Sequence, residues 1–83
     1  MAKIYYFVRY GVNARGAFSS EKEAQEWASR MEPLSINGAT VFPEVVPMEA
    51  SEEEGIVLAT RWYAEVPLGR VIMYGNEKLK EKE

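Results

Sequence analysis

The chain has 83 residues, of which 47% are hydrophobic and 28% are charged, and its formal net charge is −3. This length and composition suit one globular domain with a small core, and the longest apolar runs are too short to span a membrane. The sequence lacks cysteine, histidine and aspartate, which excludes disulfides, thiolate zinc sites and the usual catalytic triads and dyads.

The chain begins with a predicted strand. Residues 3–10 are rich in aromatic and β-branched side chains, which favour extended structure. Residues 11–16 have glycine at both ends, a pattern typical of a turn or short hairpin loop in which glycine takes positive φ. Residues 17–18 predict a brief return to strand before the next element.

An amphipathic helix is predicted over about residues 20–32. Ser20 and Glu23 have the spacing of a capping box, in which each side chain accepts a hydrogen bond from the other residue's backbone N–H. Pro33 disfavours helical geometry at the residue before it and so predicts the end of the helix. Four apolar residues recur with helical spacing along one stripe: Ala24, Trp27, Ala28 and Met31.

The middle of the chain predicts less regular structure. Residues 34–38 form a loop that contains the turn signal Asn37-Gly38. Residues 39–48 look extended, but Pro43 and Pro47 each remove a backbone donor, which predicts an edge strand or two short pieces. An acidic loop is expected to follow.

Two further strands are predicted, at residues 55–66 and 70–74, joined by a type I turn that has proline at its second position and glycine at its fourth. A two-residue loop would place Glu65 opposite Arg70. A turn with Gly69 in the left-handed region would instead place Ala64 opposite Ile72 and Trp62 opposite Tyr74, and we favour this register.

Together these elements predict an α+β fold. Residues 1–75 form a single small domain with an antiparallel sheet of about four strands, and one amphipathic helix lies on one face of that sheet. Residues 76–83 form a charged, flexible C-terminal tail.

The predicted strands carry apolar side chains on both faces. Tyr5 and Phe7 lie on one face of the first strand, while Tyr6, Val8 and Tyr10 lie on the other. A single helix of about three turns covers only one face of a sheet. Three arrangements remain open: the second face meets a partner or a second copy, residues 33–54 fold over it, or the sheet curls into a partly closed barrel.

Two sets of side chains are candidates for partner binding. An acidic segment within residues 44–54 could engage a basic surface, although the same pattern is typical of a solvated loop. Tyrosines interleaved with arginines could stack bases and hold phosphates, but there is no basic footprint or RNA-binding motif, so we favour a solvated face with cation–π pairs. The candidate partner-binding residues are Tyr6, Tyr10, Arg61, Tyr63, Glu49, Glu52, Glu53 and Glu54.

The sequence thus predicts a non-enzymatic protein–protein interaction domain that binds and modulates a larger, unidentified partner. A homodimer is compatible with this function, and the size suits a small accessory or inhibitor protein of the kind that phages and mobile elements encode. We expect no catalytic residues, cofactor or metal, a cytoplasmic location and no membrane association. The alternative is a weak single-stranded nucleic-acid-binding protein that uses the Arg/Tyr face.

Overall fold

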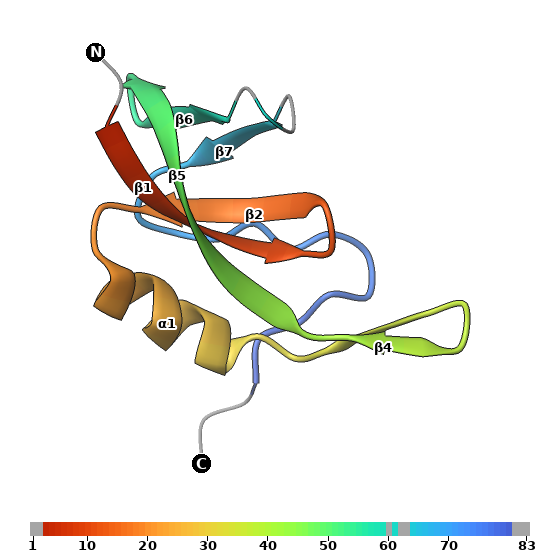
Figure 1. Ribbon diagram of the computed structural model, residues 1–83. Coiled ribbons are helices and arrows are strands. Elements are labelled where there is room, and N and C mark those ends of the chain that lie inside the picture. Colours follow the sequence, from red (N-terminus) through yellow and green to blue (C-terminus); the bar gives the residue numbers. More distant parts are fainter. Residues whose placement is uncertain (1–2, 60, 62–63, 81–83) are drawn as a thin grey trace.

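The computed structural model describes residues 3–59, 61 and 64–80 of the chain. It has an α+β fold in which the described residues form one helix and seven strands (Figure 1). In chain order the elements are β1 (Lys3–Tyr10), β2 (Asn13–Phe18), α1 (Glu21–Arg30), β3 (Leu34–Ile36), β4 (Ala39–Val41), β5 (Pro43–Glu53), β6 (Ile56–Ala59) and β7 (Ala64–Pro67).

The main sheet has five strands in the order β2-β1-β5-β6-β7, one more than the sequence predicts, and every neighbouring pair is antiparallel. β3 and β4 form a separate two-stranded sheet. The two ends of the main sheet approach each other, because Leu68, which follows β7, forms a bridge with Ala17 of β2. The N–H of Gly69 also donates to the carbonyl of Ala17 at 2.8 Å. The sheet is therefore a nearly closed barrel (Figure 1).

This closure accounts for the apolar side chains on both faces of the strands. One core lies between the five strands and is formed by Tyr5, Phe7, Ala17, Ala50, Val57, Ala59 and Val66. A second core lies between the sheet and the helix and is formed by Val8, Tyr10, Phe18, Ala24 and Met31. Of the three arrangements left open by the sequence, the chain adopts the partly closed barrel.

The predicted helix is present, with slightly narrower bounds. Ser20 is its N-cap, and the N–H of Glu23 donates to the Ser20 hydroxyl oxygen at 3.1 Å. The helix packs on β1, β2 and β5, and the ring of Trp27 stacks on Phe18 at a centroid distance of 6.1 Å. The helix ends at Arg30 because Met31 is extended, with its N–H bonded to Ala28.

β5 is the longest of the described strands, whereas its two prolines were expected to make this segment an edge strand or to divide it into two short pieces. It pairs with β1 along residues 43–50 and with β6 only from Ser51 onward. Over residues 43–50, the other edge of β5 therefore has no paired strand among the described residues. A strand tolerates proline where the missing N–H group would face such an unpaired edge. The expected acidic loop is correspondingly short, since β5 continues through Glu53.

The expected strand over residues 55–66 is two strands that form a hairpin. Val57 of β6 pairs with Val66 of β7, so both side chains face the barrel interior. The expected strand over residues 70–74 is absent, and neither predicted register is correct, because this segment crosses to β2 instead. The Trp62 pairing predicted there lies outside the described residues.

Two other segments expected to be loops contain strands. β2 begins at Asn13, so only Gly11 and Val12 connect it to β1. The Asn37-Gly38 turn is present as predicted, and it joins β3 to β4 in a hairpin that projects from the body of the molecule (Figure 1).

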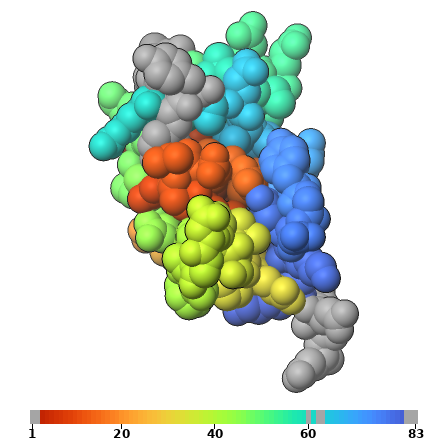
Figure 2. Space-filling view, turned by 90° about the vertical axis from the view of Figure 1, so that its right-hand side faces the viewer, coloured from red at the N-terminus to blue at the C-terminus, as the bar shows by residue number. Residues whose placement is uncertain are grey.

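Residues 70–80, here called the C-terminal strap, run along β2 and then past the end of the helix (Figure 1). Figure 2 shows the strap in blue on the surface beside the orange N-terminal strands. Leu79 forms a bridge with Met31 and packs against the helix-side core. The N–H of Glu32 donates to the carbonyl of Lys78 at 2.9 Å. The expected flexible tail is thus in contact with the body of the protein through residue 80, and residues 81–83 lie outside the described part.

Candidate partner-binding site

The outer face of the β6–β7 hairpin carries an open hollow of about 430 Å³. Because Val57 and Val66 face the barrel interior, the residues that alternate with them face outward. The hollow extends from the end of β5 to the start of the strap. It is lined by Glu53, Glu54, Ile56, Leu58, Glu65, Pro67, Arg70 and Ile72.

The floor of the hollow is apolar. Ile56 is 39% exposed, Leu58 and Ile72 are half-buried, and Pro67 is buried. The helix covers the other end of the sheet, where it packs on β1, β2 and β5. The hollow is therefore a part of the outer sheet surface, rich in apolar side chains, that lies away from both cores.

The rim of the hollow is charged. Glu53, Glu54 and Glu65 against Arg70 give it a formal charge of −2. The two ion pairs found among the described residues lie elsewhere, at Arg9–Glu44 and Arg15–Glu77. The rim carboxylates therefore form no ion pair within the described part of the chain, although Arg70 lies on the same rim.

The turn between β5 and β6 places Glu54 on this rim. Glu54 and Gly55 have φ values of 53° and 83°, nearly the same as the 50° and 82° of Asn37 and Gly38 in the other tight hairpin turn. Two consecutive positive φ values define a type I′ turn, in which asparagine followed by glycine is favoured. The Glu52 carboxylate accepts a hydrogen bond from the N–H of Gly55 at 2.6 Å, so Glu52 stabilises the turn.

The predicted acidic residues are thus divided between three places. Glu53 and Glu54 line the hollow, and Glu52 caps the turn beside them. Glu49 is exposed on β5, where it pairs with Ile4 of β1. The sequence did not predict the apolar floor of the hollow. Ile56 and Leu58 lie on one face of a predicted strand, but the sequence does not show whether that face points into the core or outward.

The predicted Arg/Tyr set does not come together as one face. Tyr10 is only 1% exposed and belongs to the helix-side core, and Tyr6 is half-buried against the same core. Arg61 is exposed in the segment between β6 and β7. Tyr63 lies outside the described residues. The described members therefore offer no shared platform on which bases could stack.

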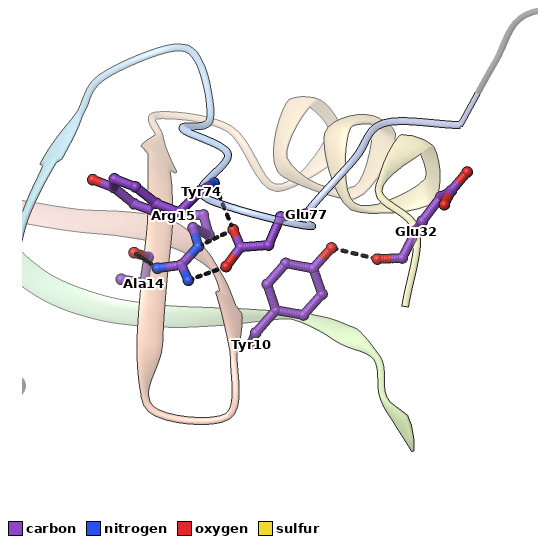
Figure 3. A network of polar contacts seen from close by, with 6 residues as sticks. All are labelled: Tyr10, Ala14, Arg15, Glu32, Tyr74 and Glu77. Carbon is purple, nitrogen blue, oxygen red and sulfur yellow. Dashed lines mark hydrogen bonds and ion pairs between the residues drawn. The ribbon is translucent and has the colours of Figure 1, made fainter. Parts of the chain in front are cut away.

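A polar network fixes the strap that supplies one side of the hollow (Figure 3). The Nε–H of Arg15 donates to Oε1 of Glu77 at 2.6 Å, and its Nη2 pairs with the second carboxylate oxygen. Only 13% of the Arg15 side chain and 9% of the Glu77 side chain are exposed. The Arg15 guanidinium lies 4.9 Å from the centroid of the Tyr74 ring. The backbone N–H of Tyr74 donates to the Glu77 carboxylate at 3.2 Å.

A bulge in β2 accompanies this network. The pairing of β1 with β2 passes from Val8–Gly16 to Arg9–Ala14, so Arg15 has no partner on β1. An extra residue of this kind redirects a side chain out of the regular alternation. The Arg15 carbonyl also accepts the N–H of Ile72 at 2.9 Å. Arg15 therefore fixes both the strap and the part of it that lines the hollow.

Tyr10 lies next to this network but has a separate partner. Its hydroxyl donates to the Glu32 carbonyl at 2.5 Å (Figure 3). Burial raises the pKa of the Tyr10 phenol, and the negative charge of Glu77 adds to the rise, which Arg15 opposes. The phenol is therefore neutral at physiological pH and acts as a hydrogen-bond donor.

No group of three metal-ligating side chains gathers within residues 3–59, 61 and 64–80. Over the same residues, no helix has the length and apolar character needed to cross a membrane. Comparisons of the chain with protein-family models, curated proteins and solved structures found no match. The case for a function therefore rests on the residues of this chain.

Proposed function

We propose that the protein is a non-enzymatic interaction domain that binds a larger protein partner through the hollow on the β6–β7 hairpin. The observation that carries the proposal is an apolar floor beside three carboxylates that form no ion pair with any described cation and outnumber the one arginine on the rim. Interfaces combine an apolar centre, which loses water on binding, with a charged rim that selects the partner. This hollow has both parts on a small scale.

The binding surface is small, which suits an accessory or inhibitor protein that modulates its partner by occupying one site. The hollow accommodates a few side chains rather than a whole domain face, so the partner contributes a short segment. Contacts of this size give weak or transient complexes unless a neighbouring surface also takes part. A second copy of the chain is the competing occupant.

Site-specific photo-cross-linking tests this proposal. A photoreactive phenylalanine analogue replaces Ile56 on the floor of the hollow, and in a control protein it replaces Gln25, which is exposed on the helix. We expect an adduct from position 56 and not from position 25. Leu58→Arg in the position-56 protein is expected to abolish the adduct while leaving the circular dichroism spectrum unchanged.

The adduct's mass identifies the occupant. A protein of a different sequence supports the proposal, and an adduct with twice the mass of the chain identifies a homodimer instead. An adduct that nuclease removes would favour the nucleic-acid alternative. Equal labelling from positions 56 and 25 would contradict a role for the hollow.

A further inference from the structure

We propose that the segment bound in the hollow carries a lysine or arginine beside an aliphatic residue. This inference rests on the proposed function and specifies the chemistry of its partner. The cation lies between Glu53 and Glu65, while its methylene stem and the aliphatic neighbour cover Ile56, Leu58 and Ile72.

The strand register places the two carboxylates on opposite sides of the apolar pair. Glu53 of β5 is directly opposite Ile56, and Glu65 of β7 is directly opposite Leu58. Residues directly opposite in an antiparallel pair have Cβ atoms about 4.5–5.5 Å apart. A side chain lying along β6 therefore has apolar contacts beneath it and a carboxylate on each flank.

Lysine and arginine have the shape that this arrangement requires. Their aliphatic stems pack on apolar surface while the charged head stays at the edge, in contact with water and with carboxylates. A purely apolar segment would use the floor but leave the three rim glutamates unpaired. An acidic segment would be repelled by a rim whose formal charge is −2.

Arg70 makes the two sides of the hollow different in charge. It comes from the strap, on the side away from β5, and none of the ion pairs between described residues involves it. A backbone carbonyl or an acidic residue of the bound segment would lie on that side. The occupant is a separate protein rather than a second copy, because a copy brings a net charge of −3 to an already acidic rim.

Methyl NMR with short peptides tests the inference on the intact protein. The probes are acetyl-Leu-Arg-Leu-amide and its acidic counterpart acetyl-Leu-Glu-Leu-amide. We expect the basic peptide to shift the methyl signals of Ile56, Leu58 and Ile72, with an effect that weakens as salt is added. Glu65→Gln is expected to raise the Kd about two- to fivefold, as for loss of one exposed ion pair. Glu26→Gln, at an exposed position on α1 outside the hollow, serves as the matched control and should leave the Kd unchanged.

The outcomes separate this inference from the proposed function. If both peptides shift the three methyl signals equally, the hollow binds protein segments without charge selection, and only the inference is overturned. If neither peptide does so and the cross-link at position 56 is also absent, both proposals are overturned. A cross-linked partner whose contact segment is acidic would overturn the inference alone.

Discussion

Gly16 of β2 lies directly against the backbone of Arg70 in the strap. A Cβ at position 16 would overlap the Arg70 carbonyl oxygen, and it would stand 3.0 Å from the carbonyl carbon, which is tighter than an ordinary contact. The backbone at Gly16 does not have positive φ, so the requirement for glycine here is one of space. The closure of the barrel and the start of the strap both depend on this contact.

Gly16→Ala is therefore expected to destabilise the protein by about 1–3 kcal/mol, the usual cost of overpacking a site that cannot relax. The measurement is the urea midpoint, together with hydrogen exchange at the Ile72 amide, which bonds to Arg15. Gly11→Ala is the control, since a Cβ there meets nothing within 4 Å and its cost comes from positive φ alone. Faster exchange at Ile72 in both variants would contradict this account.

Glu77→Gln tests how firmly the strap is held. The substitution keeps the shape of the side chain but leaves the mostly buried Arg15 without its counter-charge, which should cost about 1–3 kcal/mol. Glu44→Gln removes the pair with Arg9, in which the glutamate side chain is 61% exposed, and should cost less than about 1 kcal/mol. The comparison is made by urea unfolding. Equal losses in the two variants would show that Arg15–Glu77 does not anchor the strap.

The parts of the fold that the sequence predicted are those set by local chemistry. The Ser20 cap, the apolar stripe of α1, the first strand and the Asn37-Gly38 turn each depend on residues close together in the chain. The strand order, the bulge at Arg15 and the path of the strap depend on contacts between distant residues. A single sequence carries no direct signal for such contacts.

Gly16 illustrates why contacts between distant residues were not predicted from the sequence. As the last residue of a segment with glycine at both ends, it favoured a turn, whereas the reason for the glycine is the Arg70 carbonyl more than fifty residues later. For the same reason, only part of the candidate site was predicted from the sequence. Glu53 and Glu54 were identified from an acidic run, but the hollow beside them exists only because β6 and β7 pair with each other.

The raised pKa of Tyr10 leads us to expect a loss of stability at alkaline pH. Its pKa is raised in the folded state by burial and by Glu77, above the value near 10 of an exposed phenol. Below pH 10 the phenol is neutral in both states. As the pH rises from about 10 through the raised pKa, the unfolded state loses its proton first, and the stability falls.

Tyr10→Phe is expected to remove this part of the alkaline loss, at a cost of about 1 kcal/mol at neutral pH for the hydrogen bond to Glu32. Urea unfolding of both proteins at several pH values measures the effect, and the ultraviolet absorbance of tyrosinate reports the titration itself. An identical pH dependence in the two proteins would contradict the raised pKa.

At Glu54 we expect the requirements of stability and of binding to be opposed. It occupies a position with φ of 53° in a type I′ turn, where asparagine is favoured over glutamate. Glu54→Asn should therefore stabilise the protein by about 0.5–1 kcal/mol, because asparagine adopts a left-handed backbone at a lower cost than glutamate does. Asn37→Glu is the reverse substitution at the equivalent position of the β3–β4 turn, and it should destabilise the protein by a similar amount.

The two substitutions differ in their expected effect on binding. Glu54→Asn removes one of three carboxylates from the rim and should weaken binding of the basic peptide about two- to fivefold despite the gain in stability. Asn37→Glu lies outside the hollow and should leave the peptide Kd unchanged despite the loss in stability. Opposite signs for stability and affinity at position 54, with no change in affinity at position 37, would mean that Glu54 contributes to binding at the expense of the turn. If affinity instead follows stability in both variants, the rim glutamate has no role in recognition.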